Sequence, residues 1–344
     1  MSGEYRFSFG PWNIHEGADP FGPTVRDSIE FGKKLKMYKK LGFDGVQFHD
    51  DDAVPGMDNL SFVEIVKRAK KVRSMLEGEG LTAEFVAPRL WEDEQTIDGA
   101  YTSNDPAARQ YAKDRSRRMI EIANALGTNL IVLWLAREGT YIRETKDSKL
   151  AVERIVEAIN DMLAYNPDIK IAIEPKPNEP MDQAYIPTTG HAVAVSYLTS
   201  DPERVGVNIE SAHVVLAGLD PSDEMGFALA YKKLFTVHLN DQNGLKFDED
   251  KSFGSVDLRR AFNQVRILDQ YDYGKSGEFV GLDVKAMRTQ KPEVATKHLR
   301  NSREIFLALV ELVRSLDKYK VEKLKRERDY EELDMLIINH LMGK

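Results

Sequence analysis

The sequence predicts an α/β protein, a (β/α)8 (TIM) barrel with a C-terminal helical arm. Short apolar runs alternate with amphipathic stretches along the 344-residue chain, and eight strand–helix units over roughly 300 residues fit a closed barrel. Polar and aromatic residues follow most of the apolar runs, at the end of the strands where barrel active sites lie. The alternative, an open doubly wound sheet, usually has a glycine-rich phosphate loop after its first strand, and Phe9-Gly10-Pro11-Trp12 is no such loop.

The expected elements follow in chain order. Strands are expected at residues 7–10, 45–49, 83–86, 130–133, 169–174, 205–209, 234–239 and 279–283. Helices are expected at residues 28–41, 62–77, 107–126 and 149–164, where apolar positions recur at helical spacing. Gly42 and Gly127 follow two of these stretches, as suits a helix C-cap.

The pattern changes near residue 317. A dense charged run over residues 318–332 precedes an apolar segment over residues 333–341. Taken alone, these residues predict a solvated helix with an apolar end. We therefore divide the chain into a catalytic barrel domain, residues 1–317, and a C-terminal helical arm, residues 318–344. The other interpretation of these last residues, an arm that packs on a neighbouring subunit, is favoured by the family resemblance described below.

Composition excludes several classes of protein. A net charge of −8 argues against nucleic acid and anionic membranes as partners. No apolar run approaches the ~18 residues of a membrane span, and the N-terminal residues lack a signal-peptide pattern. The absence of cysteine removes disulfides, thiolate catalysis and cysteine-ligated zinc. A cytoplasmic location is the expectation.

The segment from Ile173 to Pro180, with sequence IEPKPNEP, is the most informative one. It follows a short apolar run, and its three prolines exclude a helix and a central sheet strand. Glu174 and Lys176, two residues apart at a strand end, suit a metal ligand beside an electrophilic lysine. The alternative is an internal ion pair of Lys176 with Glu174 or Glu179.

Acidic residues and histidines lie at or after several strand ends. Oxygen-rich sites with one or two imidazoles suit magnesium, manganese or cobalt better than structural zinc. A first site would combine Glu174, Glu210, His238 and Asp283. A second would combine Glu210, His213, Asp248 and Asp250, with Glu210 bridging the two. For any one carboxylate alone, a solvated surface position is the simpler interpretation.

Two further groups point to sugar chemistry. His49 and Asp52 form a plausible acid–base pair, since a carboxylate fixes the tautomer of a nearby imidazole; the alternative is that residues 50–52 cap a turn. Trp12, Trp91 and Trp134 are the only tryptophans, and each falls at or past a strand end. Rigid aromatic walls favour the apolar faces of sugars, although ordinary core packing is the alternative.

Together these motifs resemble the D-xylose isomerase (glucose isomerase) family, of the shorter actinobacterial type. The similarity runs almost end to end. It is carried by Phe48-His49-Asp50-Asp51-Asp52, Trp134 with Arg137-Glu138-Gly139, the 173–180 segment, Asn208-Ile209-Glu210-Ser211-Ala212-His213, the run from Leu239 to Lys246, and Asp283-Val284-Lys285. The C-terminal residues 333–343 also resemble that family's terminal segment.

The resemblance implies an aldose–ketose isomerase with two divalent metal ions (magnesium, manganese or cobalt). D-Xylose to D-xylulose is the reaction it implies first, with D-glucose to D-fructose as a second, by a metal-assisted 1,2-hydride shift. It implies that His49 assists ring opening and Asp52 orients it, that Lys176 contacts an oxygen beside the reacting carbon, and that Trp12 and Trp134 wall the pocket. Trp91 stands where the family has a wall phenylalanine.

The resemblance also implies an assembly and a backbone feature. Asp19-Pro20-Phe21-Gly22 matches a loop whose phenylalanine enters a neighbour's active site, so a homotetramer or homodimer is expected, with a small-molecule sugar as substrate. The bond between Glu179 and Pro180 is expected to be cis.

The sequence departs from the family pattern at several positions. His238 stands where an aspartate ligand is expected, Ala87 replaces a substrate-binding threonine, Arg89 replaces an asparagine, and Val214 replaces a glutamate. The histidine moves the first site toward the pattern of rhamnose isomerases and ketose 3-epimerases. A ketose 3-epimerase or another sugar isomerase of this fold is therefore the main alternative. A metal-dependent phosphodiesterase would need more histidines and a basic face, and a non-catalytic sugar-binding barrel is the remaining rival.

Overall fold

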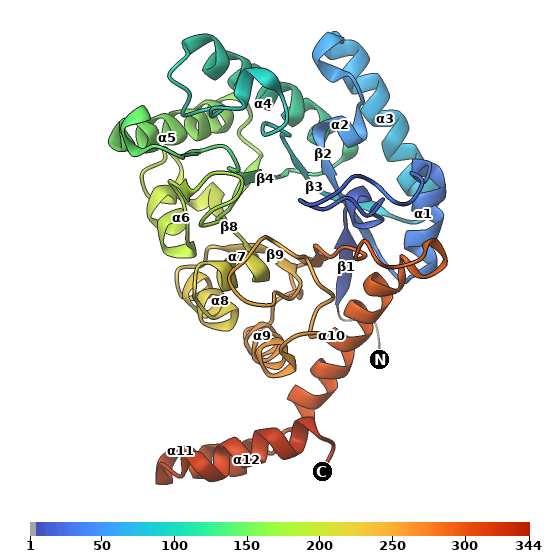
Figure 1. Ribbon diagram of the computed structural model, residues 1–344, viewed down its shortest axis with the longest axis vertical. Coiled ribbons are helices and arrows are strands. Elements are labelled where there is room, and N and C mark those ends of the chain that lie inside the picture. Colours follow the sequence, from blue (N-terminus) through green and yellow to red (C-terminus); the bar gives the residue numbers. More distant parts are fainter. Residues whose placement is uncertain (1–4) are drawn as a thin grey trace.

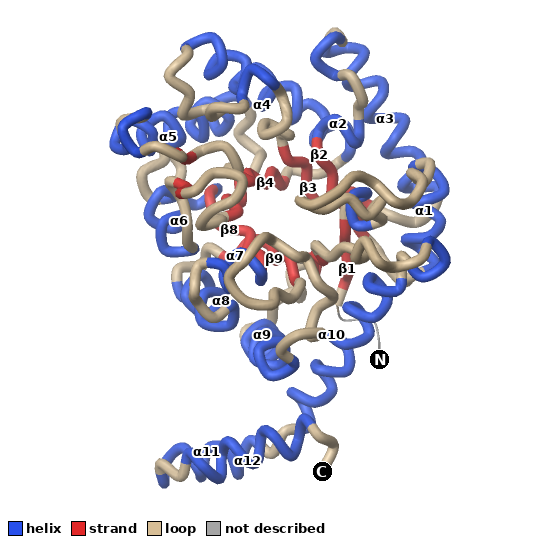
Figure 2. Tube along the Cα trace, viewed as in Figure 1, coloured by secondary structure: helices blue, strands red, loops and turns tan. Residues whose placement is uncertain are grey.

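The computed structural model describes residues 5–344 and contains a closed barrel of eight parallel strands (Figures 1 and 2). Around the barrel the strand order is β1-β10-β9-β8-β6-β4-β3-β2. These strands are β1 (Arg6–Phe9), β2 (Gly45–His49), β3 (Thr82–Ala87), β4 (Leu130–Trp134), β6 (Lys170–Glu174), β8 (Val205–Glu210), β9 (Leu234–Leu239) and β10 (Phe279–Leu282). The fold prediction is confirmed, and every expected strand is present with its ends displaced by no more than one residue.

Helices surround the barrel on its outer face (Figure 2). They are α1 (Phe31–Lys40), α2 (Asp50–Ala53), α3 (Phe62–Gly78), α4 (Pro106–Leu126), α5 (Ser148–Tyr165), α6 (Thr189–Ser196), α7 (Ser211–Leu216), α8 (Pro221–Ala230), α9 (Leu258–Gln270), α10 (Lys297–Ser315), α11 (Lys318–Glu327) and α12 (Tyr330–Leu341). Two short strands, β5 (Gly139–Thr140) and β7 (Gln183–Ala184), form a separate antiparallel pair. Helix α1 begins later than predicted because the Glu30 carboxylate caps the backbone N–H groups of Gly32 and Lys33.

The main core lies between the outer face of the barrel and the helices, where aliphatic and aromatic side chains are fully buried. Inside the barrel a smaller apolar cluster forms from Phe85, Ala87, Val132 and Ala172. Because this apolar cluster is small, it leaves the carboxyl-terminal mouth of the barrel to polar side chains.

Strand β3 contains one extra residue relative to β2. Val46 pairs with Ala83 but Phe48 pairs with Val86, so Glu84 and Phe85 together oppose Gln47. A β-bulge of this kind re-aims side chains and often lies beside an active site. It explains how two successive side chains, Glu84 and Phe85, are both buried within one short strand.

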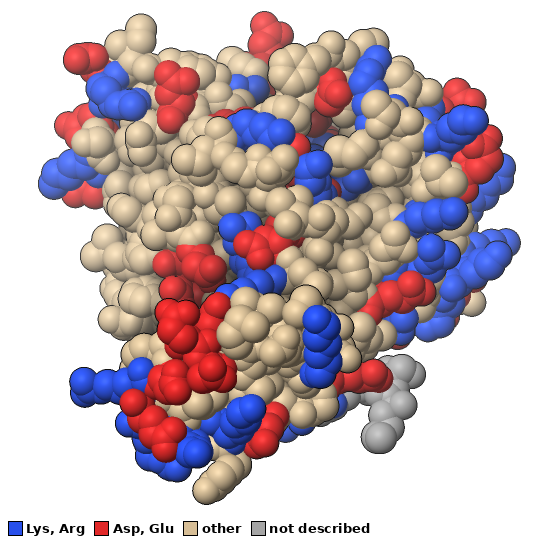
Figure 3. All heavy atoms as spheres, turned by 60° about the horizontal axis from the view of Figure 1, so that its bottom comes forward, with Lys and Arg blue, Asp and Glu red and all other residues tan. Residues whose placement is uncertain are grey.

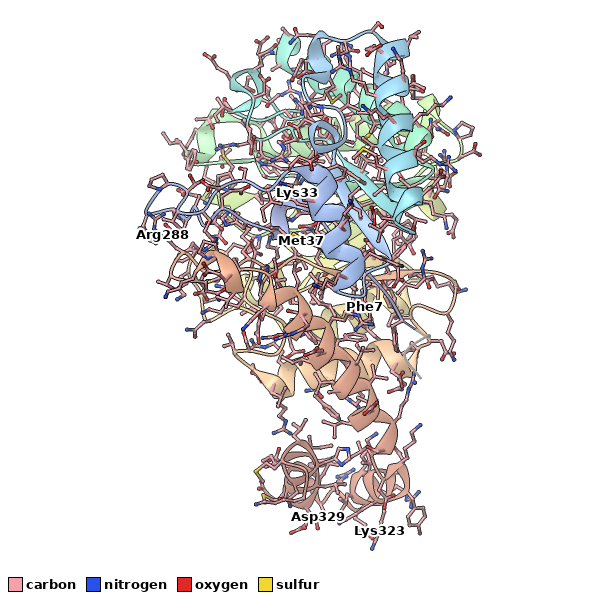
Figure 4. All side chains as sticks on the ribbon, turned by 90° about the vertical axis from the view of Figure 1, so that its right-hand side faces the viewer. Phe7, Lys33, Met37, Arg288, Lys323 and Asp329 are labelled. Atoms are coloured by element: carbon pink, nitrogen blue, oxygen red, sulfur yellow. The ribbon has the colours of Figure 1, made fainter. Side chains whose placement is uncertain are left out.

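The C-terminal arm is a hairpin of α11 and α12 that extends below the barrel in the view of Figure 1. Figure 4 shows the two helices side by side, with Lys323 and Asp329 at the lower edge. An ion pair between Arg259 and Asp334, 2.6 Å long, ties α12 to α9, while Met335 stays exposed.

The described helices include none with the length and apolar character of a membrane span. Acidic and basic side chains are intermixed over the face that Figure 3 shows.

Candidate active site

A cavity of about 630 Å³ opens at the carboxyl-terminal mouth of the barrel. Most of the predicted site residues line it: Trp12, His49, Trp91, Trp134, Glu174, Lys176, His213, His238, Asp248, Asp250 and Asp283. Glu210 is buried just beneath this surface, and Asp52 stands behind His49. The prediction that strand ends would bring these side chains together agrees with the geometry.

One group of potential ligands joins strands β6, β9 and β10. Nδ1 of His238 lies 3.3 Å from Oε2 of Glu174 and 3.9 Å from Oδ2 of Asp283. Asp283 is fixed from its other side, where Oδ1 accepts hydrogen bonds from Trp12 Nε1 at 2.9 Å and Asn13 Nδ2 at 3.0 Å. Three of the four residues predicted for the first metal site, Glu174, His238 and Asp283, therefore meet around the His238 imidazole. Glu210, the fourth, lies beside His213 in the second group.

A second group lies at the start of helix α7. Glu210 ends β8 and caps this helix, because its Oε2 accepts from the backbone N–H of His213. One ligand atom from each of Glu210, His213 and Asp248 lies within 4.8 Å of the others. Nδ1 of His213 is 3.5 Å from Glu174 Oε1 and 3.5 Å from Glu210 Oε2, so this imidazole connects the two groups.

Asp250 is the predicted ligand that stands somewhat apart. Its Oδ2 forms an ion pair with Lys285, and its Oδ1 accepts a hydrogen bond from Asn240 Nδ2 at 3.1 Å. Asn240 also donates to Glu210. The amide therefore holds Asp250 next to the second group rather than inside it.

The electrostatics of the second group favour a bound cation. Burial raises the pKa of Glu210 well above its ordinary value, and the negative charges of Asp248 and Asp250 add to that effect. Burial and the charge of Asp248 likewise raise the pKa of Asp250. Asp248 behaves oppositely, because Lys176 and His213 outweigh its burial and lower its pKa well below the usual range. Negative charge is thus in excess where the carboxylates converge.

Both groups contain imidazole nitrogens without hydrogen-bond partners. Both ring nitrogens of His238 and Nδ1 of His213 are buried and accept or donate no hydrogen bond among the described residues. Burial lowers the pKa of His238, but the charges of Glu174, Asp283 and Glu84 outweigh it and raise the pKa to about 9. Carboxylate oxygens with free imidazole nitrogens are a donor set that fits a divalent cation.

Lys176 projects between two carboxylates. Its Nζ lies 3.1 Å from Glu179 Oε2 and 3.0 Å from Asp248 Oδ2, and 5.3 Å from the centre of the Trp134 ring. Burial would lower the pKa of this ammonium, but the charges of Asp248 and Glu179 raise it, so Lys176 stays positively charged. The ion pair with Glu179, which was the alternative interpretation of Lys176, is present, whereas Glu174 faces His238 instead.

His49 and Asp52 form the predicted pair, with Nδ1 to Oδ2 at 3.0 Å. Burial would raise the pKa of Asp52, yet the hydrogen bond from His49 and the charges of His49 and Arg89 lower it. Arg89 also lies 2.8 Å from His49 Nδ1 and 2.8 Å from Asp51 Oδ1. The residues 50–52 do begin a helical turn, α2, so capping and pairing coexist.

The three tryptophans and His49 form one continuous aromatic wall. The ring of Trp12 is 4.2 Å from that of His49, His49 is 5.0 Å from Trp91, and Trp91 is 4.5 Å from Trp134. All four residues line the cavity, so the wall interpretation describes their position better than burial in the core.

Two predictions concern the loops around the cavity. The Glu179–Pro180 bond is cis, as predicted. Phe21 is 82% exposed and contacts Phe247 edge-on, with ring centres 5.6 Å apart. Its insertion into a neighbouring subunit stays a prediction. Nearby, Arg288 donates to the carbonyl of Pro23, holding this loop against the segment after β10; Figure 4 shows Arg288 at the edge of the molecule.

Sequence reasoning missed several side chains that hold the ligands in place. Asn208 donates to Glu174 Oε2 at 2.6 Å, and Asn240 and Lys285 hold Asp250. A strand period of two could have found them, because Asn208 precedes Glu210 by two residues, Asn240 follows His238 by two, and Lys285 follows Asp283 by two.

Comparison with known proteins agrees with this geometry. Residues 35–301 match the family described as the xylose isomerase-like TIM barrel. The chain is 36% identical over 314 residues to a xylose isomerase of Thermus thermophilus, covering 90% of this chain and 80% of that protein.

Solved structures share the fold. An IolI protein with a bound zinc atom aligns with a TM-score of 0.60 at 16% identity, over 89% of this chain and 98% of that one. The 3-keto-D-glucoside 4-epimerase of E. coli aligns with a TM-score of 0.61 at 15% identity, over 89% and 98%. A D-psicose 3-epimerase of Clostridium cellulolyticum aligns with a TM-score of 0.57 at 16% identity, over 91% and 98%. Because the family match spans most of the barrel, this chain belongs to the xylose isomerase-like TIM barrel family.

Proposed function

We propose that the protein is a metal-dependent aldose–ketose isomerase that converts D-xylose to D-xylulose, with D-glucose to D-fructose as a second reaction. One observation carries this proposal. A carboxylate–imidazole cluster of Glu210, His213 and Asp248 lies 3.0 Å from the Lys176 ammonium, measured from Asp248 Oδ2. The His49–Asp52 pair belongs to the same cavity, so ring opening and isomerisation have their groups in one place.

His49 and Asp52 serve the first step. A cyclic sugar must open before its carbonyl reacts, which requires a proton to move between the anomeric hydroxyl and the ring oxygen. His49 lines the cavity and is the proton-transfer group, and Asp52 holds its ring. The aromatic wall presents apolar rings to the C–H faces of the sugar and excludes water.

The carboxylates and histidines hold two divalent ions of the magnesium, manganese or cobalt class. Glu174, Glu210, His238 and Asp283 would hold one ion, and Glu210, His213, Asp248 and Asp250 would hold the other, so that Glu210 serves both sites. Such ions polarise a carbonyl and stabilise alkoxide charge. Lys176 adds a fixed positive charge for an oxygen next to the reacting carbon. The hydride then moves from C2 to C1 of the open sugar, while the C2 hydroxyl loses a proton and O1 gains one, so that the ketose is an isomer of the aldose.

The test uses metal-stripped protein with a panel of pentoses and hexoses, and with magnesium, manganese or cobalt added back. We expect D-xylulose from D-xylose only when metal is present. D-Xylose carrying deuterium at C2 should give D-xylulose that keeps the label at C1, because a hydride shift does not exchange with water. Unchanged activity after chelation, or no ketose with any aldose, contradicts the proposal.

A ketose 3-epimerase is the second candidate, and His238 favours it. An imidazole beside Glu174 and Asp283 gives a single site of two carboxylates and one histidine, which suits proton removal and return at C3. Such an enzyme would introduce solvent deuterium at C3 of a ketose in D2O, and it would tolerate loss of Lys176. Lys176→Met separates the two functions, since only the isomerase needs that ammonium.

A further inference from the structure

A buried carboxylate lies inside the barrel beneath the cavity. Oε1 of Glu84 accepts from Thr236 Oγ1 at 2.7 Å, and Oε2 accepts from Gln47 Nε2 at 3.2 Å and from the Ser8 hydroxyl. The four residues come from four strands, β3, β9, β2 and β1, and each is at most 5% exposed. We call them the inner polar cluster.

Burial of this cluster inside the barrel is expected to destabilise the folded protein. The interior layers of such barrels are dominated by branched apolar residues, and a buried carboxylate is destabilising unless it is compensated. Among the described residues, Glu84 forms no ion pair with lysine or arginine. The β3 bulge is what turns Glu84 into the interior beside Phe85. Glu84 is therefore buried by the bulge without a cationic partner, and packing alone does not explain its presence.

His238 is the potential metal ligand that lies next to the inner polar cluster. Thr236 and His238 are two residues apart on β9, so both side chains face the interior, with His238 nearer the mouth.

Gly281 leaves room between the cluster and that ring. A Cβ placed on Gly281 would lie 2.7 Å from Gln47 Nε2 and 3.1 Å from His238 Cδ2. Because Cδ2 adjoins Nε2 in the imidazole, this edge of the ring faces the cluster, whereas Nδ1 faces Glu174 and Asp283.

Two buried polar atoms complete the arrangement. His238 Nε2 and Gln47 Oε1 each have no hydrogen-bond partner. Gln47 uses its amide nitrogen for Glu84 and Ser8, so its oxygen is left as an acceptor. A ligating histidine normally donates its distal N–H to a carboxylate, a carbonyl or a water, which fixes its tautomer.

We propose that Glu84, acting through Gln47 and one buried water, holds His238 in the tautomer with hydrogen on Nε2 and a lone pair on Nδ1. Glu84 and Gln47 are then positioning residues for a metal ligand. Glu84 orients the Gln47 amide, and the Gln47 oxygen accepts from the water to which His238 Nε2 donates. This inference rests on the metal site of the proposed function.

The experiment titrates metal-stripped protein with Co²⁺ and records affinity and the visible d–d absorption. Glu84→Gln keeps the side-chain shape but loses the charge, and Gln47→Met keeps the volume but loses the acceptor. Both should weaken Co²⁺ binding about 10–100-fold and alter the absorption bands. Ser8→Ala is the matched control, because it removes one donor to Glu84 and one acceptor for Gln47 but leaves the hydrogen bond from Gln47 Nε2 to Glu84 in place. We expect its Co²⁺ affinity to stay within about threefold of the unmodified protein.

Solid-state ¹⁵N NMR of histidine-labelled protein loaded with diamagnetic Mg²⁺ gives the second readout, with His238→Asn to identify the signal. We expect a protonated Nε2 in the unmodified protein and a mixed tautomer in Glu84→Gln. Unchanged affinity, bands and tautomer in Glu84→Gln overturn the inference, and Gln47→Met decides the matter if that variant does not fold. Failure of the unmodified protein to bind Co²⁺ instead overturns the proposed function.

Discussion

Nη2 of Arg89 lies 2.8 Å from Nδ1 of His49, the same nitrogen that lies 3.0 Å from Asp52. A guanidinium only donates and a carboxylate only accepts. Nδ1 of a neutral imidazole has either a lone pair, which suits Arg89, or a hydrogen, which suits Asp52. The two residues therefore compete for one atom, and Arg89 itself also donates to Asp52 Oδ1 at 3.0 Å.

Arg89→Asn should resolve this competition in favour of Asp52. Nδ1 then carries the hydrogen and Nε2 becomes the base that faces the cavity, so we expect kcat to rise on the order of tenfold when ring opening limits the rate. Solid-state ¹⁵N NMR should show His49 moving to the Nδ1–H tautomer. Arg68→Asn, which removes a surface partner of Glu64, is the control. An unchanged His49 tautomer means that Arg89 does not set it.

Glu210→Gln should remove metal from both sites. The amide oxygen still caps α7, but the carboxylate charge in the Glu210–His213–Asp248 cluster is lost. We expect bound metal per chain, measured by mass spectrometry after gel filtration, to fall and kcat/KM to drop at least about 100-fold. Glu203→Gln, at an exposed position, should change neither quantity. Retention of both ions would show that Glu210 does not bridge.

His238 should shift the choice of metal. An imidazole nitrogen favours later first-row metals, and the site carries one negative charge less than a carboxylate would give it. We expect manganese or cobalt to activate better than magnesium, and His238→Asp to narrow that ratio on the order of tenfold. Circular dichroism should show an intact barrel in this variant. If magnesium is the best activator of the unmodified protein, His238 does not tune the metal.

His298 should make stability depend on pH. It is buried and lies 2.8 Å from the carbonyl oxygen of Asn13; burial lowers its pKa to about 4. The pKa of His298 is lower in the folded than in the unfolded protein. Its contribution to the free energy of unfolding is therefore fully present above pH ~6.5 and is lost as pH falls toward 4. Between pH 7 and 4.5 this amounts to about 2–3 kcal/mol.

Urea unfolding at the two pH values measures this effect. His298→Gln should flatten the pH dependence relative to the unmodified protein. His191→Gln serves as the control because His191 is exposed. Equal pH dependence in all three proteins contradicts the assignment.

Assembly through the arm is a further expectation. Met335 and Met342 leave apolar surface exposed near the end of the chain, and Phe21 projects from its loop. Light scattering at micromolar concentration should give a dimer or tetramer, and removal of residues 318–344 should give a smaller species with a folded barrel. Met335→Asp should also reduce the size of the assembly, whereas Lys318→Gln should leave it unchanged. A fully active monomer would refute the expectation that Phe21 of one subunit completes the active site of its neighbour.

The fold followed from the sequence because strand ends are marked by local chemistry: apolar runs stop at His49, Glu174 and Glu210, where charge begins. The β3 bulge was not predictable, since it depends on register against β2 rather than on residues 82–87 alone. The same limit applies to Arg89, whose contact with His49 joins residues 40 positions apart. Pairings across strands arise from closure of the barrel, which no local pattern encodes.

The aromatic wall has an optical consequence. Trp12, Trp91 and Trp134 are all the tryptophans in the chain, and all border one cavity. Fluorescence excited at the indole absorption edge therefore originates at a single locality. A ligand that binds in this cavity lies near all three tryptophans, and no tryptophan elsewhere in the chain adds unchanged emission to the signal. Occupancy of the cavity becomes measurable by spectral shift or quenching, without label, turnover or coupled enzymes.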